Sequence, residues 1–269
     1  MRETDKQFTG SIPGLYDRHL GPLIFEPYAR DLAARLADLA PARVLETAAG
    51  TGVATRALAS ALPPGVTILA TDLNRPMLDF AASRTGAANV AWRQADAQAL
   101  PFDDGAFDAV ACQFGAMFFP DKAAAYREAR RVLRPGGRFL LNVWDRIERN
   151  ELAHLVTEAV ASLFPEDPPL FLARTPHGYH DADAILDELR AAGFAQVAIE
   201  TVERRGWAPS PRHPAIGFCQ GTPLRLEIEA RGPGRLDEAT DVAARAVAAR
   251  FGDGPFEGRM QAHVIVATR

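Results

Sequence analysis

The stretch VLETAAGTGVAT, residues 44–55, begins as a buried strand, passes through a glycine-containing turn and continues as a helix. Gly50 and Gly52 have no Cβ atom, so the backbone of this turn can approach a ligand closely. The helix that follows presents unpaired N–H groups at its N-terminus. This strand–turn–helix unit predicts a ligand site at the carboxyl end of the strand.

A second strand, within ILATDLNRPML at residues 68–78, ends on Asp72. An acidic residue about twenty residues after the glycine turn can accept both hydroxyls of a ribose. The alternative is that the glycines only form a tight turn and Asp72 caps the next helix. Because both features occur at the expected spacing, they favour a nucleoside-containing cofactor.

Two residues of the first stretch argue against a dinucleotide. Thr55 occupies the place where the G-x-G-x-x-G fingerprint has its third glycine or alanine. Glu46, at the end of the strand, would repel a pyrophosphate but suits a ligand with a positive charge. A nucleotide-binding oxidoreductase is therefore the less favoured reading.

The third strand ends in RQADAQALPF, residues 93–102. Asp96 can accept a hydrogen bond from the amino group of adenine, and the N–H of Ala97 can reach a ring nitrogen. Taken alone, Asp96 is better explained as the cap of a helix or a turn.

The motifs VLETAAGTGVAT, ATDLNRPML, RQADAQALPF, FDAVACQFGAMFF and EARRVLRPGGRFLL resemble the class I S-adenosylmethionine-dependent methyltransferases. The likeness is strongest to the ubiquinone and menaquinone biosynthesis (methyltransferase type 11) group and covers roughly residues 42–144. The opening SIPGLYDRHLGPLIFEPYARDL resembles the helices that close over the cofactor in that group.

This resemblance implies an α/β fold: a Rossmann-like, seven-stranded, mostly parallel sheet with helices on both faces and an antiparallel last strand. An N-terminal helical lid and a helical insertion before the last strand complete the expected fold. The chain is expected to be one domain, 1–269, with a lid (1–40), a cofactor-binding core (41–145) and a substrate-side half (146–269). The insertion is expected at about 210–252.

The cofactor implied is S-adenosyl-L-methionine, with S-adenosyl-L-homocysteine as product. The resemblance assigns cofactor contacts to Glu46, Ala48, Gly50, Gly52 and Gln113 at the methionine part, Asp72 at the ribose, Met77, Asp96 and Ala97 at the adenine, and Leu73 beside Asp72. Ala48 departs from the family, which usually has glycine there, so the affinity or the geometry of the turn is expected to differ.

Histidine is the natural base if the acceptor is a hydroxyl, a thiol or an acidic carbon. YDRHLGP supplies His19, and TPHGYHD supplies His177 and His180. We take His19 and His180 as the catalytic candidates, although hydrogen bonding at the start of a helix explains His180 equally well. Tyr16 is a candidate to flank the sulfonium through a cation–π contact.

Composition sets the remaining expectations. The net charge of −4 provides no basic excess for nucleic acid. No apolar run approaches the ~18 residues of a membrane span, and no secretory signal is evident. Cys112 and Cys219 lack metal-ligand spacing, so no metal is expected.

We therefore expect a cytoplasmic enzyme that methylates a small molecule on O, N or C, and a homodimer is allowed. The alternatives are a methyltransferase acting on RNA or protein, a nucleotide-binding oxidoreductase, and a non-catalytic binding protein.

Overall fold

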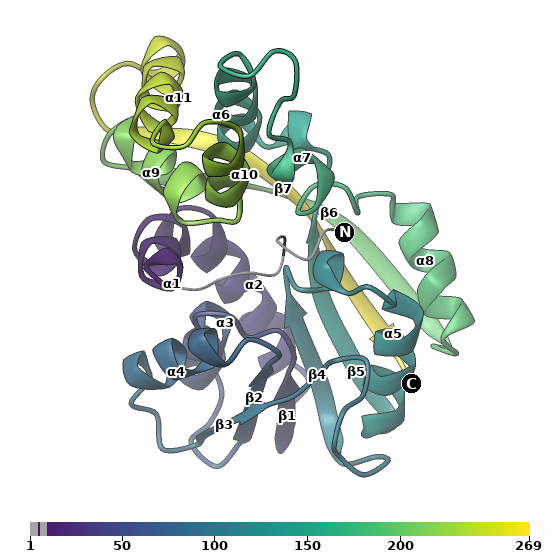
Figure 1. Ribbon diagram of the computed structural model, residues 1–269. Coiled ribbons are helices and arrows are strands. Elements are labelled where there is room, and N and C mark those ends of the chain that lie inside the picture. The colour runs from purple at the N-terminus through teal and green to yellow at the C-terminus, as the bar shows by residue number, and fades with distance from the viewer. Residues whose placement is uncertain (1–4, 6–9) are drawn as a thin grey trace. The chain divides into compact units, whose positions relative to one another are not determined.

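The computed structural model describes residue 5 and residues 10–269 (Figure 1). Residues 1–4 and 6–9 of the expected lid lie outside the described residues. The chain divides into two compact units, each built from segments distant in sequence. Unit 1 comprises Met1–Pro27, Trp144–Tyr179 and Glu203–Gln261, and unit 2 comprises Tyr28–Val143, His180–Val202 and Ala262–Arg269. The expected division into lid, core and substrate-side half stays a prediction.

One seven-stranded sheet has the order β3-β2-β1-β4-β5-β7-β6. Its strands are Arg43–Glu46 (β1), Thr67–Asp72 (β2), Val90–Gln94 (β3), Phe107–Gln113 (β4), Leu133–Trp144 (β5), Gln196–Ala208 (β6) and Phe256–Thr268 (β7). Strands β1 to β5 pair in parallel.

The last strand runs opposite to β5. Arg269 donates its N–H to the carbonyl of Gly137, while Asp145, eight residues further along the chain, donates to Gln261. Residue numbers that fall along one strand while they rise along its partner indicate antiparallel pairing. The predicted mostly parallel sheet with an antiparallel last strand is therefore confirmed.

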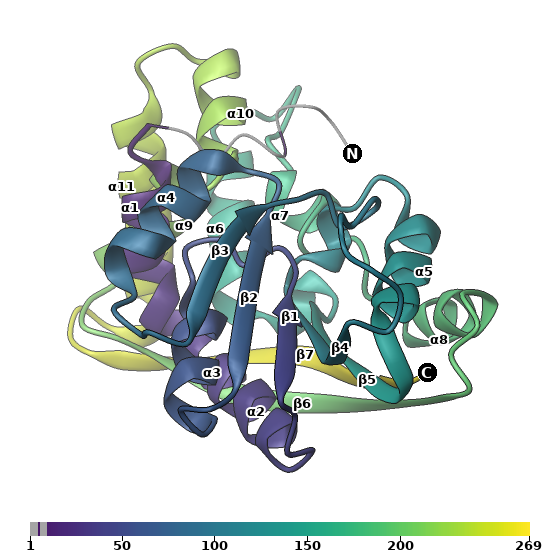
Figure 2. The same cartoon turned by 90° about the horizontal axis from the view of Figure 1, so that it is seen from below.

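Helices cover both faces of the sheet in unit 2 (Figure 2). They are Glu26–Ala37 (α2), which begins in unit 1, Val53–Ala61 (α3), Arg75–Arg84 (α4), Lys122–Val132 (α5) and Ala182–Ala191 (α8). On one face, Leu36 of α2 and Leu58 of α3 share an apolar cluster with Leu140 of β5. On the other, Phe139 packs against Tyr126 of α5, with ring centroids 6.0 Å apart. Successive side chains of β5 point to opposite faces of the sheet, so the strand contributes apolar side chains to the helix layer on each face.

The helices of unit 1 include the predicted insertion. They are Ile12–Leu15 (α1), the π-helical Tyr16–Phe25 (η2), Glu151–Ala161 (α6), Phe171–Arg174 (α7), Arg212–Gln220 (α9), Leu224–Arg231 (α10) and Leu236–Phe251 (α11). Ala116–Phe118 (η3, in unit 2) and Ile147–Arg149 (η4) are single 3₁₀ turns. In α11, Ala239, Ala243 and Val247 are fully buried and lie four residues apart on one face. This face packs against α6 and α9.

Strand β5 begins at Leu133 and so includes the RPGG segment, residues 134–137. Leu133 pairs with Phe107, and the register then shifts so that Arg138 pairs with Ala109. The RPGG segment is therefore a bulge within the strand. Gly136 supplies the left-handed backbone that the bulge needs, with φ of 76°.

Two turns at the carboxyl edge of the sheet place non-glycine residues in the left-handed region, Ala48 after β1 (φ 53°) and Phe114 after β4 (φ 51°). This conformation is unfavourable for L-residues. A Cβ atom added at Gly115 would collide with the Cβ of Ala48 and lie 3.0 Å from Cys112 Sγ. The methyl group of Ala48 therefore fits because residue 115 has no side chain.

We expect Gly115→Ala to lower the free energy of unfolding by about 1–3 kcal/mol, the usual cost of overpacking. Ala48→Gly in the same chain should restore most of that loss, because it removes the atom that the added methyl group would strike. Urea unfolding of the two single variants, the double variant and the parent measures the coupling. Additive effects of the two substitutions would contradict the contact.

Candidate functional site

The glycine turn after β1 is fixed to the end of β2 by three hydrogen bonds. The N–H of Gly50 donates to Asp72 Oδ2 at 2.8 Å, and the N–H of Ala49 donates to the carbonyl of Thr71 at 2.9 Å. Thr71 Oγ1 donates in turn to the carbonyl of Glu46 at 2.8 Å. The turn and the carboxylate that the sequence singled out therefore lie together.

The residues present fit a ribose-bearing cofactor. Asp72 Oδ1 accepts the N–H of Asn74 at 2.7 Å, so each carboxylate oxygen has one bond and keeps a second lone pair. Gly50 has φ of 56°, and no described atom lies within 4 Å of the place a Cβ would take. Thr51 Oγ1 is buried and has no hydrogen-bond partner among the described residues. A ligand in this turn would satisfy that hydroxyl, which sequence reasoning did not single out.

Glu46 is a buried carboxyl at the floor of this site, with 1% of its surface exposed. Thr55 Oγ1 donates to its Oε2 at 2.6 Å. Burial raises the pKa of Glu46 to about 8, and the nearby charge of Asp72 acts in the same direction. Glu46 is therefore protonated at neutral pH until a positive charge is placed beside it.

The free energy of unfolding should fall as the pH rises from about 4.5 to about 8 because of Glu46. Its folded pKa is raised above the ordinary value of 4.5, so the folded state holds a proton that the unfolded state releases across this interval. Glu46→Gln keeps the acceptor oxygen and removes the titration. Denaturant unfolding at several pH values should give a flatter profile for this variant. Parallel profiles for the two proteins would contradict the raised pKa.

The other predicted cofactor residues lie at neighbouring strand ends of unit 2. Asp96, after β3, accepts the N–H of Gln98 at 2.9 Å and so closes the turn that was the alternative explanation. Ala97 is half-buried within that turn. Met77 is buried on α4, and Leu73 is 53% exposed beside Asp72. Contact of these residues with a cofactor stays a prediction.

The two histidines predicted as catalytic have structural partners. The carbonyl of His180 accepts from His263 Nε2 at 2.9 Å, and the adjacent Asp181 caps α8. In unit 1, His19 Nδ1 lies 3.2 Å from His213 Nδ1. Burial, with a smaller effect of His213, lowers the pKa of His19 to about 4. His19 is thus a weak base at neutral pH, and both catalytic assignments stay predictions.

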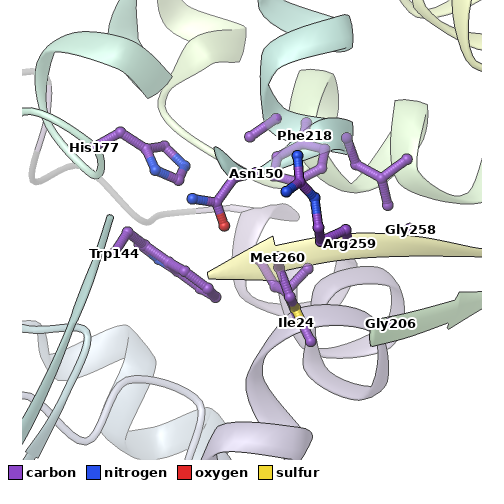
Figure 3. A pocket seen from close by; sticks show the side chains of 11 residues that line it. Ile24, Trp144, Asn150, His177, Gly206, Phe218, Gly258, Arg259 and Met260 are labelled. Carbon is purple, nitrogen blue, oxygen red and sulfur yellow. The ribbon is translucent and has the colours of Figure 1, made fainter. Parts of the chain in front are cut away.

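A pocket in unit 1 contains a third histidine of interest (Figure 3). It is lined by Ile24, Trp144, Asn150, Leu152, Ala153, His177, Gly206, Phe218, Gly258, Arg259 and Met260. His177 is 5% exposed, and its ring centroid lies 5.9 Å from that of Trp144. Its Nδ1 is 2.8 Å from the carbonyl oxygen of Asp145. A carbonyl can only accept, so in the neutral ring Nδ1 carries the proton and Nε2 the lone pair.

Two polar residues complete this pocket. Backbone groups hold the side chain of Asn150 in place. Its Nδ2 donates to the carbonyl of Asp145, and its Oδ1 accepts the N–H of Gln261. Arg259 has its guanidinium 3.9 Å from a carboxylate oxygen of Glu203, a long ion pair. The pocket thus combines apolar walls with a histidine and a cation.

Tyr16 stacks on Phe25 within unit 1, with ring centroids 4.8 Å apart. The contact of Tyr16 with a sulfonium stays a prediction.

Over residue 5 and residues 10–269, no helix combines the length and apolar character needed to cross a bilayer. In the same part of the chain, no three His, Cys, Asp or Glu residues are grouped so that they could hold a metal ion.

Comparison with known proteins identifies relatives. A family model described as a methyltransferase domain matches residues 45–141. The chain is 35% identical over 170 residues to a demethylmenaquinone methyltransferase of Mycolicibacterium gilvum (strain PYR-GCK), covering 60% of this chain and 72% of that protein. It is 30% identical over 265 residues to the nocamycin O-methyltransferase of Saccharothrix syringae, covering 91% of each.

Among solved structures, phosphoethanolamine N-methyltransferase 2 of Haemonchus contortus, in complex with S-adenosylhomocysteine, has a similar fold. The TM-score is 0.62 at 17% identity, covering 100% of this chain and 60% of that one.

Proposed function

Because the chain belongs to the S-adenosylmethionine-dependent methyltransferases, we propose that unit 2 binds S-adenosyl-L-methionine at the turn of residues 47–52 and Asp72. The observation that carries this proposal is the bond from the N–H of Gly50 to Asp72 Oδ2. It fixes the open turn beside a carboxylate whose remaining lone pairs match a ribose diol.

The remaining contacts follow the order of the strands. We assign the adenine to Asp96, Ala97 and Met77, with the exposed Leu73 covering the nucleoside. Gln113 and the buried Glu46 are assigned to the methionine part, which carries positive charge on its ammonium and sulfonium groups. A cation in this place would lower the raised pKa of Glu46, so cofactor binding should release a proton at neutral pH.

When bound, the cofactor supplies an electrophilic methyl group on a sulfonium. The protein's contribution is to position the acceptor in line with that group and to exclude water. The two relatives named above methylate small molecules according to their names. The net charge of −4 provides no basic excess for RNA, which supports a small-molecule acceptor here. We further propose a cytoplasmic enzyme.

Asp72→Asn should weaken binding of S-adenosyl-L-homocysteine by about 1.5–3 kcal/mol, roughly 10- to 150-fold, because it removes a charge-assisted acceptor. Asp79→Asn is a matched control, since Asp79 is exposed on α4 and pairs with Arg75. Isothermal titration calorimetry measures both variants, with NADH as the comparison ligand. Unchanged affinity of the Asp72 variant would contradict the ribose assignment, and preferential NADH binding would favour the oxidoreductase.

A further inference from the structure

Asn142 of β5 carries a buried amide without a partner. Its side chain is 0% exposed, and neither Nδ2 nor Oδ1 has a hydrogen-bond partner in the described part of the chain. Its backbone is satisfied, since the carbonyl accepts the N–H of Phe114 at 3.0 Å. Folded proteins leave few buried polar atoms unpaired, because each has lost its water without gaining a replacement. The amide therefore lowers stability and needs a functional explanation.

The register of the sheet places this amide with the proposed cofactor residues. Asn142 pairs with Gln113 and, two residues earlier, Leu140 pairs with Ala111, which pairs with Glu46. Partners in register share a face of the sheet, and so do residues two apart. Asn142 and Gln113 therefore lie on the face of Glu46, one row closer to the carboxyl edge.

Asp72 belongs to the same row, because it follows by two residues Ala70, the β2 partner of Glu46. The row thus runs from Asp72 on β2, past the turn after β1, to Gln113 on β4 and Asn142 on β5. Neighbouring strands are about 4.8 Å apart, so Asn142 lies three strands, about 14 Å, from the proposed ribose site. With the ribose at β2 and the methionine part at β1 and β4, the next group along the row is the acceptor.

The backbone of Asn142 is bonded to an aromatic residue. Phe114 donates its N–H to the carbonyl of Asn142 and packs edge-on against Tyr28 of α2, with ring centroids 5.4 Å apart. The left-handed backbone of Phe114 is a strained conformation of the kind found at ligand sites.

We infer that Asn142 is a positioning residue for the methyl acceptor, an inference that rests on the proposed function. A carboxamide presents an N–H donor beside a carbonyl acceptor. It can form two hydrogen bonds at once with a group that places an acceptor opposite its N–H and a donor opposite its carbonyl oxygen. The acceptor class is therefore a molecule that carries an N–H or O–H donor next to a carbonyl oxygen.

Asn142→Leu tests this role because it keeps the volume and removes both unpaired polar atoms. We expect its free energy of unfolding to equal or exceed that of the parent and its affinity for S-adenosyl-L-homocysteine to stay within twofold. Asn89→Leu is the matched control. The Nδ2 of Asn89 donates to the carbonyl of Val66 at 3.0 Å, so its loss should destabilise the protein.

Specificity is measured with two probes, 2-quinolone and N-methyl-2-quinolone, which differ in whether the N–H beside the carbonyl is present. Calorimetry on protein loaded with S-adenosyl-L-homocysteine should give at least tenfold tighter binding of 2-quinolone to the parent and to Asn89→Leu. Asn142→Leu should bind the two probes equally. Asn142→Ala, which also lacks the amide, should show the same equality if the leucine variant does not fold.

Three results would overturn the inference. Destabilisation of Asn142→Leu as large as that of Asn89→Leu would mean that the amide is paired within the fold. A tenfold loss of S-adenosyl-L-homocysteine affinity would make Asn142 a cofactor residue. Equal binding of the two probes to the parent would remove the specificity role. Failure of the parent to bind S-adenosyl-L-homocysteine at all would instead refute the proposed function.

Discussion

The hydrogen bond from the N–H of Gly50 to Asp72 is the constraint on which the proposed cofactor site depends. The donor belongs to the turn after β1, and the acceptor is the last residue of β2. The bond therefore joins the carboxyl ends of two neighbouring strands. Thr71 reinforces it through its bonds to Ala49 and Glu46. Because Asp72 accepts the N–H groups of both Gly50 and Asn74, one carboxylate shapes the turn after β1 and the start of the next crossover. A change at this residue therefore affects the conformation of the turn as well as the ligand.

Stability and function oppose each other along the carboxyl edge of the sheet. Glu46 is a carboxyl almost without exposure to water, Thr51 and Asn142 bury polar atoms without partners among the described residues, and Ala48 and Phe114 occupy a strained backbone region. None of these features stabilises the unliganded fold. A charged or hydrogen-bonding ligand would supply the missing interaction at Glu46, Thr51 and Asn142. The layers beneath, where Leu58 and Leu140 belong to one apolar cluster, show no such conflict.

Sequence patterns predicted the strands that end at Glu46 and Asp72 and the proximity of Gly50 to Asp72, because these follow from periodicity, turn chemistry and the common edge of parallel strands. They did not single out His177, which lines the pocket in unit 1. Its place there depends on a tertiary contact, the hydrogen bond between Nδ1 and the carbonyl of Asp145. Asn142 was missed for a related reason. Within FLLNVW it occupies an inward position of a core strand, and only the packed structure shows that its amide has no partner in the described part of the chain.

The exchange of glycine for alanine at position 48 shows how a departure from a family pattern is accommodated. An added methyl group in a turn can be directed at the ligand or at the protein. Here the Cβ of Ala48 is directed at residue 115, where glycine leaves the space it needs, while a Cβ at Gly50 would meet no described atom. The open side of the turn is therefore the side of Gly50. It follows that Ala48 changes the packing between β1 and β4 and leaves the ligand side of the turn open.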